Sequence, residues 1–123
     1  MTYEIPGFTR SFQAAGDLSA QQYKAVKLSG ATIVAVAAVG DRHIGILQNK
    51  PSVAGAAGTV MVSGVTRAVC DAAIAAGVPV YLAADGRVSA TATSASRVGF
   101  SESATTAANQ HISVLLLPQH AAA

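Results

Sequence analysis

The residues of this chain that could do chemistry are few and widely spaced. Asp41 and His43 are two positions apart, so on a β-strand both would point to one face and could hold a metal ion if a third ligand, such as His111, came from elsewhere. Cys70 is the only cysteine, so an internal disulfide is impossible, and as a nucleophile it would need a nearby base, for which His43, His111 and His120 are the candidates. The simpler interpretation is that His43 flanks a strand at the surface and that Cys70 is a small buried apolar residue.

The six carboxylates do not suggest a catalytic pair. Asp41, Asp71 and Asp85 fall at expected turns or caps, where an aspartate accepts hydrogen bonds from nearby backbone N–H groups. The segment 55–58 lacks the Gly-Lys-Ser/Thr sequence of a phosphate-binding loop, and a flexible hairpin tip accounts for its glycines. We therefore expect a protein that is not an enzyme, with no catalytic residue, no cofactor and no metal site. The enzyme alternative would need a deep pocket around the histidines or the cysteine.

Charge and composition narrow the class of partner. The chain has 123 residues, a net charge of +2 and only 11% charged residues. Its basic residues are scattered and make no stripe that could follow a phosphate backbone, so no nucleic acid partner is expected. A sparsely charged surface is easily desolvated against another protein, although a composition rich in Ala and Gly would give the same low charge.

Neither a membrane span nor a signal peptide is apparent. No apolar run approaches about 18 residues, so we expect no membrane partner. The N-terminal sequence MTYEIPGFTR has no basic region followed by an apolar stretch. We expect the protein to be made in a cytoplasm.

Short strands separated by turn residues dominate the chain from residue 23 onward. The expected strands are 23–28, 32–36, 43–48, 59–63, 65–70, 79–82, 87–88, 97–101 and 112–117. Gly64 suggests a bulge or tight bend within a continuous hairpin, and Asp85-Gly86 is a hairpin turn. At most one short helix is expected, over 71–77, where Asp71 could cap it and Gly77 could end it, and a turn-like connection is the alternative for the same segment. About eight short strands predict an all-β fold, a small antiparallel β-barrel or β-sandwich.

The first 20 residues differ from the rest of the chain. They hold half of the six aromatic residues and show neither a helical period nor sustained alternation. We divide the chain into an extended N-terminal arm (1–20), a β-barrel domain (21–118) and a flexible tail (119–123). The arm either docks on a neighbouring subunit or folds back over its own barrel. Its candidate interface residues are Tyr3, Ile5, Phe8 and Phe12.

An ordered series of turn-and-strand segments gives a resemblance that covers residues 16–118. The segments are 16–23 (GDLSAQQY), 26–28 (VKL), 45–51 (GILQNKP), 60–65 (VMVSGV), 75–81 (AAGVPVY), 85–88 (DGRV), 98–101 (VGFS) and 112–116 (ISVLL). In order and spacing they resemble the tailed-phage capsid decoration proteins, also called cement or head-stabilising proteins.

The resemblance implies a β-barrel-like structural protein on the outer capsid surface of the virion, made in the host cytoplasm. The implied partner is the major capsid protein, which such a protein binds, often as a homotrimer or in contact with neighbouring copies of itself. It would bridge neighbouring capsomers and stabilise the expanded head against internal DNA pressure. The alternative function is that of a β-barrel binding module for a host-surface ligand such as a glycan.

Overall fold

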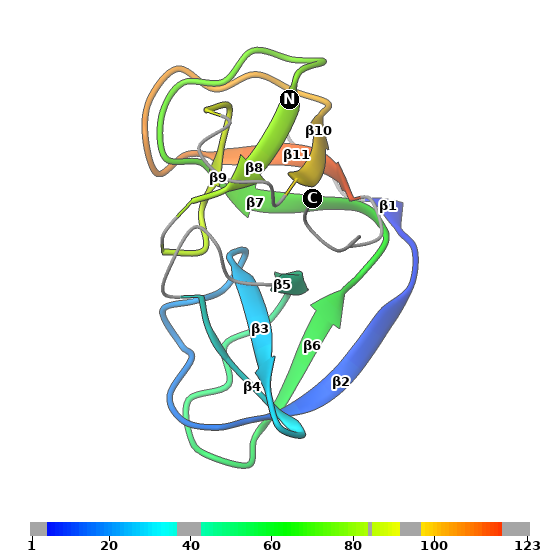
Figure 1. Ribbon diagram of the computed structural model, residues 1–123, viewed down its shortest axis with the longest axis vertical. Helices are drawn as coiled ribbons and strands as arrows, with labels where there is room; N and C mark the ends of the chain where they lie inside the picture. Colours follow the sequence, from blue (N-terminus) through cyan, green and yellow to red (C-terminus); the bar gives the residue numbers. More distant parts are fainter. Residues whose placement is uncertain (1–4, 37–42, 84, 92–96, 117–123) are drawn as a thin grey trace.

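The computed structural model describes residues 5–36, 43–83, 85–91 and 97–116, whose arrangement is shown in Figure 1. The strands are β1 (Ile5–Pro6), β2 (Thr9–Ala14), β3 (Ala25–Ser29), β4 (Thr32–Ala35), β5 (His43–Leu47), β6 (Ala57–Met61), β7 (Gly64–Val69), β8 (Pro79–Leu82), β9 (Val88–Ser89), β10 (Arg97–Ser101) and β11 (His111–Leu116). The predicted all-β fold is confirmed. Among the described residues no helix is present, so none is long and apolar enough to cross a membrane.

The strands form a barrel and a sheet. Strands β2, β4, β3, β5 and β6 close a five-stranded barrel, which fills the lower half of Figure 1. Strands β1, β7, β11, β10, β8 and β9 make the six-stranded sheet above it. All of these strand pairs are antiparallel except β2 with β4, which is parallel. The prediction of an antiparallel barrel therefore holds for every neighbouring pair but one.

Strands β3, β5 and β6 lie between two buried clusters. Each of these strands carries two consecutive buried residues. One of the two packs inside the barrel, in the smaller cluster, and the other packs against the six-stranded sheet, in the larger cluster. The pairs, with the barrel residue first, are Val26 with Ala25, Leu47 with Ile46, and Val60 with Met61. Because successive side chains point to opposite faces of a strand, a strand buried on both faces carries adjacent apolar residues. The larger cluster thus packs the barrel against the sheet.

The chain passes between barrel and sheet along two neighbouring segments. Pro6 pairs with Gly64 in the sheet, and Thr9 pairs with Met61 in the barrel. A Cβ atom on Gly7 would lie 2.7 Å from the backbone oxygen of Ser63, so the two segments approach too closely for a side chain at that position. The prediction of one continuous hairpin around Gly64 is therefore wrong, since β6 and β7 belong to different sheets.

The boundary predicted at residue 20 also needs correction. Strand β2 lies inside the predicted arm, yet it pairs with β6 from Thr9 to Gln13 and with β4 at Gln13 and Ala14, which closes the barrel. Residues 9–14 thus fold back onto the chain's own barrel, because their backbone groups bond to its strands. The predicted tail, 119–123, lies outside the described residues.

Residues 71–77 form the turn-like connection and not the short helix, the two conformations that the sequence left open, because this segment bonds to distant parts of the chain. The backbone N–H of Ile74 donates to the Thr105 hydroxyl (3.1 Å), the N–H of Thr105 donates back to the Ile74 carbonyl (2.9 Å), and the N–H of Gly77 donates to the Ser101 carbonyl (2.8 Å). The Ile74 side chain is buried in the larger cluster. A helix of one or two turns is costly to nucleate, so these contacts outweigh its local hydrogen bonds.

Removing the Thr105 hydroxyl is expected to loosen this segment. Thr105→Val keeps the side-chain shape but leaves the buried N–H of Ile74 without its acceptor, so the free energy of unfolding should fall by about 1–3 kcal/mol. Urea titration of the two proteins measures the difference. Thr105→Ser keeps the hydroxyl and is the control, and an equal loss in both variants would contradict the role assigned to the hydrogen bond.

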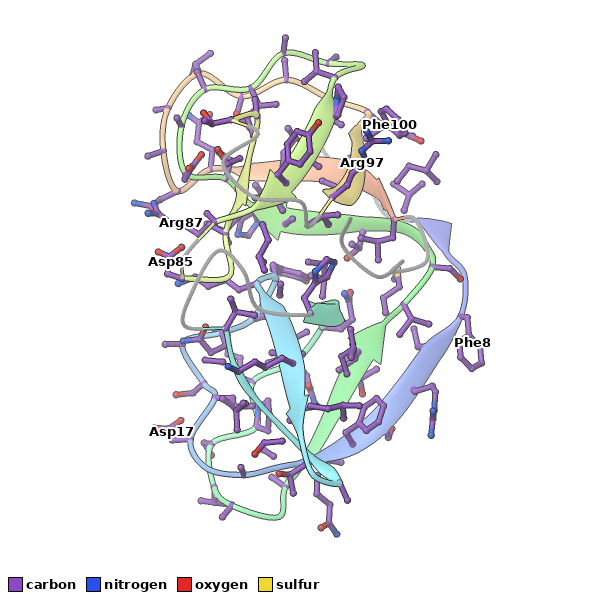
Figure 2. All side chains as sticks on the ribbon, in the orientation of Figure 1. Phe8, Asp17, Asp85, Arg87, Arg97 and Phe100 are labelled. Carbon is purple, nitrogen blue, oxygen red and sulfur yellow. The ribbon has the colours of Figure 1, made fainter. Side chains whose placement is uncertain are left out.

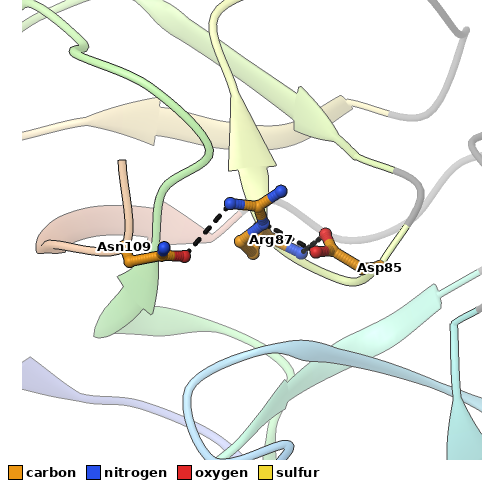
Figure 3. A network of polar contacts seen from close by, with 3 residues as sticks. All are labelled: Asp85, Arg87 and Asn109. Atoms are coloured by element: carbon orange, nitrogen blue, oxygen red, sulfur yellow. Dashed lines mark hydrogen bonds and ion pairs between the residues drawn. The ribbon is translucent and has the colours of Figure 1, made fainter. Parts of the chain in front are cut away.

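The predicted Asp85-Gly86 turn is confirmed and is joined to a distant loop. Gly86 has a φ of +87°, which favours glycine. Figure 3 shows Arg87, whose Nε lies 2.7 Å from Asp85 Oδ2 and whose Nη1 donates to Asn109 Oδ1 (3.1 Å). Burial opposes ionisation of Asp85, but the hydrogen bonds and positive charge of Arg87 outweigh it, so the pKa of Asp85 lies below its ordinary 3.8. Such a surface ion pair contributes little to stability and mainly orients the turn.

Candidate protein-binding surface

Phe8 has a fixed backbone and an exposed side chain. Its carbonyl oxygen accepts a hydrogen bond from Val62 N–H (2.9 Å), and its own N–H donates to the Ser63 hydroxyl (3.2 Å). The ring is nevertheless 57% exposed and points outward at the edge of the molecule in Figure 2. An aromatic ring that is anchored through its backbone loses little conformational entropy when a partner covers it. Phe8 is therefore well suited to contact another protein.

Phe12 belongs largely to the barrel. It is half-buried and packs against the barrel cluster. Arg10, two positions earlier on the same strand, places its guanidinium carbon 4.9 Å from the centre of the Phe12 ring. Arg10 is exposed, so the pair presents a cation stacked on an aromatic face beside Phe8 in the sequence.

The four residues predicted for the interface thus have different environments. Phe8 is exposed and Phe12 is half-buried against the chain's own core. Ile5 lies in β1, where it pairs with Val65, and Tyr3 lies outside the described residues. We use the name N-terminal surface for Phe8, Arg10 and Phe12.

Those residues considered for catalysis that the structure describes, His43, Cys70 and His111, are not arranged as a site. His43 is buried, 4% exposed, so its predicted surface position is wrong, and desolvation lowers its pKa from 6.5 to about 4. Cys70 is buried as predicted, and its thiol donates to the carbonyl oxygen of Ala107 (3.2 Å). His111 pairs with Val69, so its side chain shares a face with Val69 and the Cys70 side chain points to the opposite face. His111 instead packs edge-on against the Tyr23 ring, with centroids 5.2 Å apart.

The part of the chain that the structure describes contains no cluster of metal-ligating side chains. There, no group of three or more His, Cys, Asp or Glu side chains is close enough to hold an ion. Asp41 and His120 lie outside the described residues. Asp17, which is described, accepts a hydrogen bond from the Ser19 N–H (2.9 Å), and this bond lowers the pKa of the carboxyl below 3.8.

Sequence reasoning missed a second set of surface residues, on the six-stranded sheet. Arg97 lies over the rings of Tyr81 and Phe100, and Leu115 on the next strand is 37% exposed. The signal was weak because these residues come from three separate strands and no local pattern in the sequence links them. The strand pairing is what brings them together.

Known proteins resemble this chain in fold and in sequence. The solved structure of the head fibre gp8.5 N base of bacteriophage phi29 superposes with a TM-score of 0.65, covering 93% of this chain and 98% of that chain at 14% identity. At that identity the likeness shows the fold alone. No curated protein matches. The model of the phage cement protein family matches residues 12–116, nearly the whole described chain. The chain therefore belongs to the phage cement protein family, and its role is that of a structural protein associated with the phage capsid.

Proposed function

We propose that this protein decorates the outer surface of the phage head, where it binds the major capsid protein lattice and bridges neighbouring capsomers. Its role is mechanical and involves no catalysis or cofactor. It acts as a homotrimer or in contact with neighbouring copies of itself, and it stabilises the expanded head against the pressure of packaged DNA. The observation that carries the proposal is the family match over residues 12–116.

The distribution of polar groups supports a structural role. Several buried polar side chains hold the chain's own loops: Ser101 accepts from the Val78 N–H (3.1 Å) and donates to the Ala75 carbonyl (2.7 Å), and Ser103 accepts from the Ser113 N–H (2.9 Å). These hydroxyls are occupied in maintaining the fold. Phe8, by contrast, has a hydrogen-bonded backbone and an exposed aromatic ring that a partner could contact.

Many weak contacts suffice for such a mechanism. On a closed shell each copy adds buried area between subunits, and the contributions of many copies act together. A protein that binds the expanded lattice and not the earlier, compact one stabilises the expanded state by mass action. The energy required to separate capsomers rises accordingly.

Binding to capsids tests the proposal directly. Purified protein is mixed with expanded capsids that lack it, and with unexpanded ones, and the bound protein is quantified after sedimentation. We expect saturable, stoichiometric binding to expanded capsids and a higher temperature of DNA release from filled heads. Absence of binding to every capsid state would overturn the proposal.

Phe8→Ala is expected to separate attachment from folding. Because the ring is mostly exposed, the free energy of unfolding should change by less than about 0.5 kcal/mol. Loss of a central aromatic contact should weaken capsid binding about tenfold or more, as measured by sedimentation over a range of protein concentrations.

Val53→Ala is the matched control for this experiment. Val53 is 62% exposed and lies between β5 and β6, so its truncation also removes an exposed apolar side chain. Equal affinities of the Phe8 and Val53 variants for the capsid would show that Phe8 makes no contact. Deleting residues 1–15 is less informative, since it would remove β2 from the closed barrel.

A further inference from the structure

An apolar row crosses the outer face of the six-stranded sheet. Phe100 pairs with Pro79 on one side and with Leu115 on the other, and Leu115 pairs with Val65, which is buried and ends the exposed part of the row. Directly paired residues of neighbouring strands point to the same face of a sheet. The opposite face is the core side, because Val80, Val98 and Val114 of these strands are fully buried in the larger cluster.

A β-bulge adds a cation to this row. Arg97 pairs with Tyr81, and the register of β10 against β8 then shifts, so that Gly99 pairs with Val80 and Phe100 with Pro79. Without the shift, residues three positions apart on a strand would point to opposite faces. With it, Arg97 and Phe100 lie on one face, and the Arg97 guanidinium carbon is 5.6 Å from the centre of the Phe100 ring and 6.0 Å from that of Tyr81. Figure 2 shows Arg97 beside Phe100 at the upper end of the molecule.

The charge of Arg97 is oriented but not neutralised within the described part of the chain. The contacts of its guanidinium group there are the two rings. Aromatic faces hold a guanidinium group in place while its N–H donors remain free to meet a carboxylate in the fork-to-fork geometry. Arg97 is exposed, Tyr81 and Phe100 are half-buried, and Leu115 extends the apolar area beside them.

We propose that Pro79, Tyr81, Arg97, Phe100 and Leu115, which we call the sheet surface, form a second capsid-binding surface that receives an Asp or Glu side chain set among apolar residues of a capsid subunit. The inference rests on the proposed function. Charge complementarity indicates the partner, because a binding partner that buries Arg97 must supply an anion to pair with it. The apolar row beside Arg97 must in turn meet a partner surface that is easily desolvated. Because the sheet surface and the N-terminal surface lie on different sheets, the protein would hold the shell at two places.

The test compares charge-matched variants in capsid binding. Arg97→Gln removes the cation, and Lys50→Gln, in the exposed loop after β5, makes the same change in net charge away from the sheet surface. We expect Arg97→Gln to weaken binding to expanded capsids about tenfold or more and Lys50→Gln to weaken it less than threefold. Arg97→Lys should fall between wild type and Arg97→Gln, because lysine keeps the charge but not the planar fork. Raising the salt concentration should weaken the wild type more than Arg97→Gln.

The outcomes separate this inference from the proposed function. If the wild-type protein binds no capsid state, the proposed function itself fails. If the wild type binds and Arg97→Gln binds equally well, the sheet surface is not a contact and the proposed function stands. The sheet surface could instead bind a second copy of this chain, and sedimentation velocity on the free proteins tests that alternative. If the wild type forms an oligomer that Arg97→Gln dissociates, the sheet surface contacts another copy, and its assignment to the capsid is overturned. Equal urea midpoints for all variants confirm that the fold is retained.

Discussion

Replacing Gly99 by alanine is expected to lower the free energy of unfolding by about 3 kcal/mol. Gly99 lies in β10, between β11 and β8, immediately after the register shift. A Cβ atom there would meet the backbone carbonyl oxygen of Leu115 far inside contact distance, and a backbone atom of a central strand cannot move aside as a flexible side chain can. Urea titration of wild type and variant measures the loss.

Gly16→Ala is the control for the Gly99 substitution. A Cβ atom on Gly16 would have no neighbour within 4 Å, and its φ lies outside the left-handed region. Its free energy of unfolding should stay within about 1 kcal/mol of wild type, with a small gain because alanine restricts the unfolded chain. Equal stability of the Gly99 and Gly16 variants would contradict the close approach of β10 and β11.

Stability should fall by about 2 kcal/mol between pH 7.5 and pH 5 because of His43. Burial lowers the pKa of this side chain from 6.5 to about 4. At pH 7.5 the imidazole is mostly neutral in both the folded and the unfolded protein. Between pH 6.5 and 4 the unfolded chain binds a proton that the folded chain excludes, so protonation favours unfolding. The loss should approach about 3 kcal/mol near pH 4 and then level off.

A His43→Gln variant isolates this effect from other titrating groups. Glutamine does not titrate, so the difference in unfolding free energy between pH 7.5 and pH 5 should shrink by about 2 kcal/mol relative to wild type, whatever the absolute stability of the variant. Measurements above pH 5 keep most carboxylates ionised, which limits the contribution of Asp and Glu. An unchanged difference would mean that His43 accepts a proton in the folded protein.

Much of the strand pattern could be read from the sequence, because it follows from local residue types. The expected strands at 43–48, 79–82 and 97–101 match β5, β8 and β10 within one residue at either end, and the Asp85-Gly86 turn occurs where predicted. Alternation of side chains, proline at strand ends and glycine at turns act over a few neighbouring residues. These signals are independent of which strand pairs with which.

The failed predictions all depend on contacts between distant residues. Strand β2 reads as polar and irregular, but Phe12 pairs with Gly58 and Ala14 with Ile33, and these pairings make it a barrel strand. The choice that the sequence left open for residues 71–77, a short helix or a turn-like connection, likewise depends on hydrogen bonds to Ser101 and Thr105. His43 is polar and was expected at the surface, although β5 runs between two buried clusters. Local propensity is weaker than such tertiary contacts.

The candidate surfaces likewise combine features that local sequence could indicate with features that depend on tertiary contacts. The aromatic content of residues 1–20 singled out both Phe8 and Phe12, but it could not show that Phe8 is exposed while Phe12 packs against the barrel cluster. The sheet surface was invisible, because a one-residue register shift decides whether Arg97 and Phe100 share a face.

By itself, the sequence determined the all-β class, the positions of most strands and, through the order of its segments, the resemblance to phage cement proteins. Only the tertiary structure decided that the strands divide into a closed barrel and a six-stranded sheet, and that residues 9–14 belong to the barrel. The physical reason is that strand formation draws on residues close in the chain, whereas sheet partnership and register are fixed by burial and hydrogen bonding between residues that lie far apart in the sequence.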